Sequence, residues 1–285
     1  MPVSPSPALA SFLALLRCPA CGERLHSGGG ALRCPARHTF DIAHHGYVSL
    51  LAGPRATSGD DAAMTRARDR FLATGRYAPI RRTVAHLAAD AVPVPGTVLD
   101  VGCGTGYYLA GVLEQLPGAR GLGLDTSVRA LRATARAHAR GAAAAWDVFR
   151  PLPLADAGVD VVLDVFAPRN PPEFHRVLRP GGRLIVVRPT PRHLAELQRT
   201  VPGMVAIDPD KERRLHGVLD PYFEAAHTER VEYVTALTRA EAADLVRMTP
   251  RAPHAGPAEL GALPSEVTVS VLATAYRGRR SRNSR

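Results

Sequence analysis

From residue 97 onward, short apolar runs alternate with stretches of helical periodicity, and this pattern constrains the fold more than any other feature. The runs are continuous rather than alternating, so each strand is expected to be covered on both faces of a parallel sheet. The predicted strands span residues 97–100, 121–125, 142–147, 159–166 and 183–188, with helices over 107–116, 128–140 and 172–178. Two alternating segments, 231–237 and 267–276, flank a helix over 239–248. We therefore predict a Rossmann-like α/β fold with a mostly parallel, seven-stranded sheet.

A glycine-rich loop follows the first of these strands and opens the next helix. Glycine lets the backbone approach a ligand closely. The dinucleotide-binding loop needs G-x-G-x-x-G, and Tyr107 stands where the last glycine would be. The spacing D-x-G-x-G-x-G instead fits the loop that binds S-adenosylmethionine (SAM) in class I methyltransferases. A carboxylate that ends the second strand could accept both ribose hydroxyls, so the predicted SAM residues are Asp100, Gly102, Gly104, Thr105, Gly106 and Asp125.

Two weaker candidates lie further along the sheet. Asp147 falls near the end of the third predicted strand, where a polar side chain can meet the adenine amino group. The segment Asn170-Pro-Pro-Glu173 resembles a base-methylating N-P-P-aromatic motif, but Glu173 replaces the aromatic residue. We favour the start of a helix at this segment, with its two prolines in the first turn.

The N-terminal region carries a set of potential metal ligands. Cys18 and Cys21 are two residues apart, and Cys34 and His38 follow after twelve residues, with three between them. Thiolates and imidazole at this spacing are typical of a closed, tetrahedral Zn²⁺ site. Four protein ligands leave no open position, so the predicted zinc is structural.

The chain is strongly basic. It has 36 Lys and Arg against 26 Asp and Glu, a formal net charge of +10. Such an excess favours a polyanionic partner such as nucleic acid. No apolar run approaches the ~20 residues that cross a bilayer, so no membrane association is expected. Four cysteines are too few for a disulfide scaffold, and we expect a cytoplasmic protein with reduced thiols.

Composition divides the chain into four parts. Residues 1–50 form the predicted zinc module, which we expect to recognise RNA. Residues 51–75 form a linker and helix, and residues 76–276 the methyltransferase domain. Helical periodicity runs from residue 64 toward the prolines near residue 93. Residues 277–285 read as a basic, disordered tail.

These motifs, taken in order, resemble the RlmA family of bacterial 23S rRNA guanine-N1 methyltransferases. The resemblance rests on CPAC and CPARHTFDIAHHGYVSLL, then GRYAPI, LDVGCGTGYY, PRHL and LVRMTP, and runs from about residue 17 to about residue 250. The block FAPRNPPEFHRVLRPGG resembles the Gram-positive branch, which includes a macrolide (tylosin) resistance enzyme.

The resemblance implies site residues that the pattern alone does not. Zinc would be held by Cys18, Cys21, Cys34 and His38, and the SAM site would use Tyr77, Gly104, Thr105, Asp125 and His193. Tyr77 and His193 are assigned only through the resemblance. A 23S rRNA hairpin is the implied substrate, S-adenosylhomocysteine the product, and a homodimer the expected assembly.

Methylation of guanine N1 requires the loss of its proton, which calls for a general base. The candidates are Asp164, Asn170 (as a carbonyl that orients the base) and His193, and the sequence does not choose among them. Arginines that we expect to meet RNA phosphates are Arg66, Arg68, Arg70, Arg76, Arg81 and Arg82. Two other functions stay open: a small-molecule methyltransferase, and a non-catalytic RNA-binding protein that retains the fold.

Overall fold

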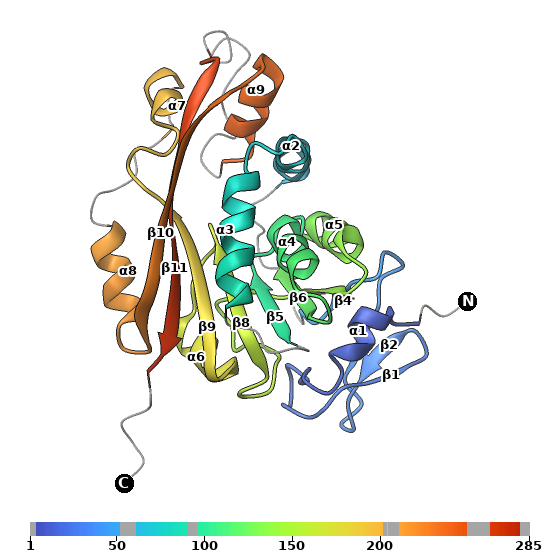
Figure 1. The fold of residues 1–285 in the computed structure, drawn as a ribbon. Helices are drawn as coiled ribbons and strands as arrows, with labels where there is room; N and C mark the ends of the chain where they lie inside the picture. The colour runs from blue at the N-terminus through green and yellow to red at the C-terminus, as the bar shows by residue number, and fades with distance from the viewer. Residues whose placement is uncertain are drawn as a thin grey trace.

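A computed structural model describes residues 4–51, 61–90, 96–201, 204, 211–249 and 263–279. Its main feature is one large twisted sheet with helices on both faces (Figure 1). The strand order is β10-β11-β9-β8-β5-β6-β7-β4. The strands are β4 (Val48–Ser49), β5 (Thr97–Val101), β6 (Arg120–Asp125), β7 (Gly141–Ala145), β8 (Val159–Val165), β9 (Leu178–Pro189), β10 (Phe223–Ala236) and β11 (Glu266–Gly278). The strands from β4 to β9 pair in parallel, whereas β11 pairs antiparallel with β9 and with β10.

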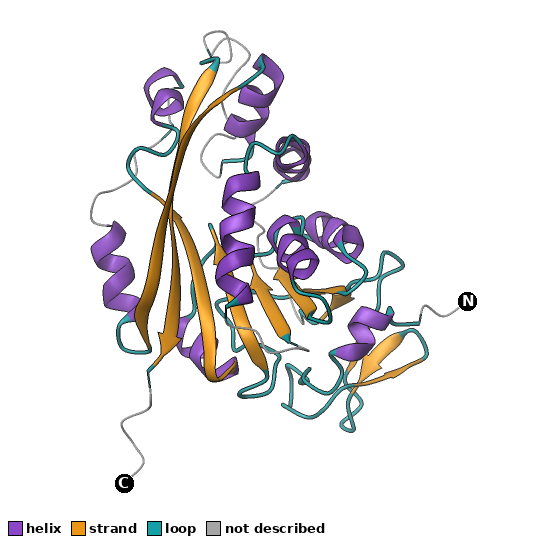
Figure 2. Ribbon diagram, viewed as in Figure 1, coloured by secondary structure: helices purple, strands orange, loops and turns teal. Residues whose placement is uncertain are grey.

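The central strands are buried on both faces, as their continuous apolar runs predict. Along β5, Leu99 and Val101 pack on one face, whereas Val98 packs on the other. The second face is covered by α3 (Ala78–Ala89), α4 (Tyr107–Gln115) and α9 (Arg239–Arg247). The first face is covered by α1 (Pro7–Ser11), α6 (Pro171–Val177) and α8 (Lys211–Leu219). Further helices are α2 (Ala62–Ala73), α5 (Val128–Ala137) and α7 (Ala195–Thr200), and in Figure 2 strands β10 and β11 reach beyond the parallel strands toward α9.

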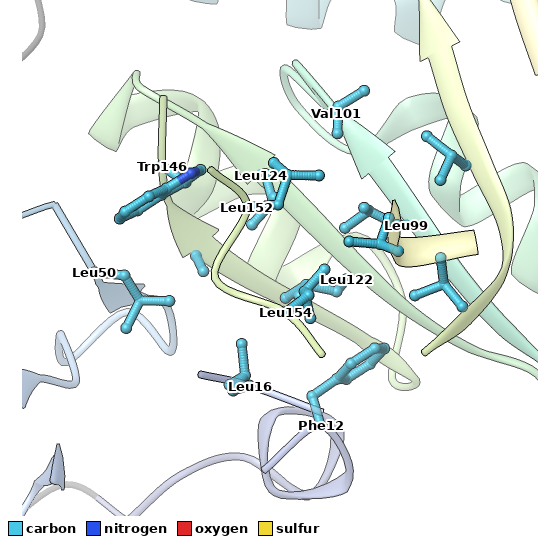
Figure 3. Close-up of a cluster of buried hydrophobic side chains, with 14 of the residues drawn as sticks. Phe12, Leu16, Leu50, Leu99, Val101, Leu122, Leu124, Trp146, Leu152 and Leu154 are labelled. Atoms are coloured by element: carbon cyan, nitrogen blue, oxygen red, sulfur yellow. The ribbon is translucent and has the colours of Figure 1, made fainter. Parts of the chain in front are cut away.

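The N-terminal region packs directly against this sheet. Strands β1 (His26–Gly28), β2 (Ala31–Arg33) and β3 (Thr39–Asp41) form a small antiparallel sheet of their own. Phe12 and Leu16, which follow α1, are fully buried and lie among Leu122, Leu154 and other residues of the main core (Figure 3). The backbone N–H of Arg17 donates to the carbonyl of Pro153 at 2.9 Å. The N-terminal region and the large sheet therefore share one hydrophobic core.

The seven predicted strands and the three helices between the parallel ones are present, with shifted ends. An eighth strand, β4, joins the edge of the sheet from within residues 1–50. The single helical region expected from residue 64 is two helices, because Gly75 takes a left-handed φ of 77° after α2 and Pro79 stands in the first turn of α3.

The first two residues of the segment expected to be a basic tail belong to a strand. Strand β11 includes Arg277 and Gly278, which pair with Arg183 on β9 and Phe223 on β10. Residues 280–285, and residues 52–60 of the predicted linker and helix, lie outside the described residues. Helices α7 and α8 had no sequence prediction.

Candidate active site and metal centre

The glycine-rich loop joins β5 to α4 at the carboxyl edge of the parallel strands. Gly102, Gly104 and Gly106 all have positive φ, at 65°, 54° and 80°. A Cβ on Gly102 would lie 2.7 Å from the Cβ of Ala167, and one on Gly106 would lie 3.0 Å from the Cα of Thr134. The first and third glycines are therefore required by both backbone conformation and space. Thr105 is buried between them.

Asp125 connects this loop to the end of β6. One of its carboxylate oxygens accepts the N–H of Gly104 at 2.9 Å, and the other accepts the N–H of Ser127 at 2.8 Å. Strands β5 and β6 are parallel neighbours, so their carboxyl ends meet at one edge of the sheet. The structure thus brings the predicted loop and the predicted carboxylate together.

Two further carboxylates lie beneath the loop. Asp100, on β5, is buried, and its Oδ2 has no hydrogen-bond partner among the described residues. Burial raises its pKa well above the ordinary value, and the nearby charges of Asp125 and Asp164 raise it further. A backbone hydrogen bond from Leu109 acts in the opposite direction, but the buried oxygen without a donor is costly, and a cationic ligand would relieve that cost. SAM carries a sulfonium and an ammonium group, so the residues present fit this cofactor.

Asp164, on β8, has no exposed surface. The guanidinium Nη2 of Arg169 lies 3.4 Å from its Oδ1. Burial raises its pKa to about 7, although Arg169 acts in the opposite direction. Asp164 is thus a buried carboxylate that ionises near neutral pH.

This burial gives a prediction about pH. The pKa of Asp164 rises from 3.8 to about 7 on folding, so the folded state binds the extra proton between these values. The free energy of unfolding of the ligand-free protein is therefore expected to fall by a few kcal/mol between about pH 4 and pH 7. In Asp164→Asn this part of the slope should disappear, as measured by urea unfolding across that range. Asp69→Asn, at an exposed position on α2, is the matched control, and an equal slope in Asp164→Asn and wild type would contradict the prediction.

Tyr77 and His193 meet at the same edge, although 116 residues separate them. The Nδ1 of His193 accepts the backbone N–H of Ser270 at 3.2 Å, so the proton of the neutral ring is assigned to Nε2. Nε2 then donates to the hydroxyl of Tyr77 at 3.3 Å, which leaves the phenolic proton free for another acceptor. Burial lowers the pKa of His193 to about 4, so the ring is neutral at physiological pH.

Asp147 and Asn170 lie together beside the end of β7. Asp147 Oδ1 accepts the N–H of Phe149 at 3.0 Å. Asn170 Nδ2 donates to the carbonyl of Val148 at 2.8 Å, and Asn170 is the N-cap of α6, which begins at Pro171. The favoured prediction of a helix start at this segment is confirmed. The amide nitrogen of Asn170 fixes the turn that carries Asp147.

The predicted metal ligands converge. The sulfurs of Cys18, Cys21 and Cys34 and the Nδ1 of His38 all lie within 4.8 Å of one another. The Sγ atoms of Cys21 and Cys34 are 3.6 Å apart, and Nδ1 of His38 lies 3.3 Å from Cys34 Sγ. A tetrahedral zinc ion at about 2.3 Å from each sulfur places them about 3.8 Å apart, so the cluster fits Zn²⁺.

Several of the arginines expected to meet RNA are engaged within the protein. Arg70 forms a 2.6 Å ion pair with Asp244, Arg76 pairs with Glu241 at 3.1 Å, and Arg81 pairs with Glu114 at 2.8 Å. The spacing of residues 66 and 70 on one helix face does not reveal these partners, which come from distant parts of the chain. Arg68 donates to the carbonyl of Met248. Arg66 and Arg82 are exposed and fit the expectation better.

Sequence reasoning missed one residue of this edge. Phe166 follows β8 directly, and its ring lies 6.4 Å from that of Tyr77 and 6.0 Å from that of His193. In the sequence it reads only as the last residue of a buried strand, so no local signal distinguishes it. Among the described residues, no helix is long and apolar enough to span a membrane.

Comparison with known proteins agrees with both parts of the structure. Residues 16–54 match the family model for the N-terminal region of RlmA, a zinc ribbon, and residues 98–182 match a methyltransferase domain. The chain is 47% identical to a putative 23S rRNA (guanine-N(1)-)-methyltransferase of Micromonospora griseorubida, over 91% of this chain and 94% of that protein. It is 44% identical to the 23S rRNA (guanine(748)-N(1))-methyltransferase of Streptomyces fradiae, over 92% of this chain and 96% of that protein.

A solved structure also supports the fold. A putative methyltransferase in complex with the Haloferax volcanii Trm112 activator is 19% identical, with a TM-score of 0.51, over 78% of this chain and 99% of that chain. The similarity in sequence extends over nearly the whole of two relatives, and the zinc ribbon and the methyltransferase domain occur in the expected order. The chain therefore belongs to the RlmA-type family of 23S rRNA (guanine-N1)-methyltransferases, enzymes with a class I SAM-dependent domain and an N-terminal zinc ribbon.

Proposed function

We propose that this chain transfers the methyl group of SAM to N1 of a guanine in a hairpin loop of 23S rRNA, in the cytoplasm. The observation that carries the proposal is the site at the carboxyl edge of β5 and β6, where Asp125 anchors the glycine loop. The unpartnered carboxylate oxygen of Asp100 beneath it suits the positive end of SAM, and Tyr107 at the position of the last dinucleotide-loop glycine counts against a nicotinamide dinucleotide. The rRNA substrate is supported by the relatives and by the net charge of +10.

Different residues of the site would bind different groups of SAM. Asp125 would accept the ribose hydroxyls of the cofactor, and Asp100 would face its positive end. The phenolic proton of Tyr77, set by the tautomer of His193, would donate to the carboxylate of SAM. Asp147 would meet the adenine amino group. In-line methyl transfer depends mainly on this alignment and on the exclusion of water, which can supply several kcal/mol of barrier reduction.

The three candidates for the general base differ in what they can do. Both ring nitrogens of His193 are engaged, and the amide nitrogen of Asn170 holds a turn, so we propose positioning roles for these two. The pKa of Asp164, about 7, suits a proton acceptor at neutral pH. Because Asp164 is buried, it would act only on a guanine extruded into the pocket or through a water molecule.

The zinc module would bind the RNA hairpin, and the methyltransferase domain would transfer the methyl group. Its ligands form a closed set of four, so the metal supplies structure rather than Lewis-acid chemistry. The shared core around Phe12 and Leu16 would hold the two parts in a fixed relation. Domain limits at residues 50 and 76, and a homodimer, are part of the same proposal, and light scattering on the purified protein tests the dimer.

The decisive experiment is methylation of unmodified 23S rRNA with labelled SAM, followed by mapping of the modified nucleotide. We expect one guanine in a hairpin loop to be labelled at N1. Transfer to a small metabolite but not to rRNA would replace this function with that of a small-molecule methyltransferase. SAM binding without any transfer would favour a non-catalytic RNA-binding protein. Expression in a macrolide-sensitive strain tests whether the modification protects against tylosin.

A further inference from the structure

Phe166 is an aromatic residue at the surface of the candidate active site, and both its exposure and its backbone conformation are energetically unfavourable. It is 41% exposed, whereas the residues before it on β8 are all buried. Its φ is 57°, a left-handed conformation that is unusual for a bulky side chain. Backbone strain of this kind persists where surrounding structure enforces it and is common at functional sites. Leu194, next to His193, has the same φ, so two strained residues border this site.

The surroundings of Phe166 explain how the conformation is enforced. Its backbone N–H donates to the carbonyl of Val187 at 3.2 Å. The following residue, Ala167, is pressed against Gly102 of the cofactor loop, where an added Cβ would come within 2.7 Å. The backbone beside Phe166 is therefore closely packed against the loop.

The ring itself is supported by three neighbours from separate parts of the chain. It stacks on His193, with ring centroids 6.0 Å apart and planes at 25°. The rings of Tyr77 and Tyr108 lie 6.4 and 6.5 Å away. All three neighbours are buried, whereas Phe166 keeps an exposed surface.

Among the described residues, Phe149, beside Asp147, is a second exposed aromatic side chain at this edge, but the ring contacts with Tyr77, Tyr108 and His193 belong to Phe166. The segment Asn170-Pro-Pro-Glu173 has a glutamate at the position of an aromatic, and Glu173 is bound to Arg176 at 2.6 Å. Phe174, the next residue, is fully buried in the core. The guanidinium of Arg81 covers the ring of Tyr107 at 5.0 Å.

We infer that Phe166 is the stacking platform for the target guanine, an inference that rests on the proposed function. A base extruded from a hairpin needs a π-surface to replace the stacking it has lost, and proteins commonly provide an aromatic ring for this. The end of β8 is adjacent to both the cofactor loop and Asp164, so a base stacked there faces the predicted methyl donor. Phe166 thus takes the place of the aromatic that the Asn-Pro-Pro-Glu segment lacks.

The test compares Phe166→Ala and Phe166→Leu with wild type and with Val234→Ala, which removes an exposed apolar side chain on β10. The RNA is a synthetic hairpin that contains the mapped guanine. Loss of a stacking aromatic typically weakens binding about 5- to 150-fold per base, so we expect KM for the hairpin to rise within that range in both variants. Binding of S-adenosylhomocysteine, measured by calorimetry, should change less than twofold, and Val234→Ala should behave as wild type.

A spectroscopic readout is independent of turnover. The chain has one tryptophan, the buried Trp146, so Phe166→Trp adds a second fluorophore at the site. This variant should retain methylation, and its fluorescence should be quenched by the hairpin in the presence of S-adenosylhomocysteine. A hairpin with an abasic site in place of the guanine should not quench it.

The outcomes separate this inference from the proposed function. If wild type methylates no hairpin, the proposed function fails. If wild type methylates the hairpin and Phe166→Leu does so with unchanged KM and kcat, the stacking role is wrong. A loss of S-adenosylhomocysteine binding in a folded Phe166→Leu would instead assign the ring to the cofactor, which also overturns the inference.

Discussion

Replacing Asp125 with alanine is expected to weaken binding of S-adenosylmethionine by about 100-fold or more. In the proposed binding mode, two ribose hydroxyls donate to this carboxylate, each hydrogen bond is worth about 1.5–3 kcal/mol, and the substitution would remove both. It also removes the acceptor for the N–H groups of Gly104 and Ser127, at 2.9 and 2.8 Å, so the loop loses its anchor. Calorimetric titration of the purified protein with SAM measures the effect.

The matched control for this prediction is Asp69→Ala, which removes an exposed carboxylate on α2. Asp125→Asn separates the two contributions, because the amide oxygen can still accept one N–H while the charge is lost. We expect Asn to bind SAM more tightly than Ala and more weakly than Asp. Affinity within threefold of wild type in a folded Asp125→Ala would show that the cofactor does not rest on this residue.

The glycine loop and Asp125, which we propose to bind SAM, could be placed side by side from the sequence because of their position in the chain. The glycine loop and Asp125 end two strands that are consecutive in sequence and adjacent in the sheet, so local patterns suffice to place them together. Tyr77 and His193 come from the start of α3 and from the segment after β9. Only the tertiary fold joins them, and only the family resemblance pointed to them in the sequence.

Phe166 and the arginines illustrate the limits of local patterns in two other ways. The exposure of Phe166 depends on one backbone torsion after β8, and an apolar run does not encode where the chain leaves the sheet. The charge of Arg70 and Arg76 is visible in the sequence, but their partners on α9 lie more than 160 residues away. The spacing of the arginines therefore indicates a basic segment, but it does not indicate which of these arginines lack an acidic partner within the protein and could bind RNA.

The zinc ligands could be predicted because they lie close together in the sequence. The effect of the metal site on the stability of the whole protein could not be predicted in this way. Cys18 and Cys34 belong to the same buried cluster as Leu16 and Leu122, so the metal site and the main sheet are continuous. We therefore expect Cys34→Ser to abolish stable zinc binding and to lower the melting temperature of the whole protein by about 10 °C or more. In a chain of this size that corresponds to several kcal/mol, a fraction of what a structural zinc contributes in an isolated finger.

Cys103→Ala provides the control, since this cysteine lies in the cofactor loop and outside the metal cluster. Elemental analysis should find one zinc per chain in wild type and Cys103→Ala and none in Cys34→Ser, and a chelator should lower the melting temperature of the first two only. RNA affinity should fall with the metal, whereas SAM affinity in the folded fraction should not, because the ligands of the two sites are separate. A chain that binds no zinc after refolding with the metal, or that melts at the same temperature with and without chelator, would contradict the structural role. If chelation lowered the melting temperature but left RNA affinity unchanged, the zinc would stabilise the shared core without contributing to RNA binding.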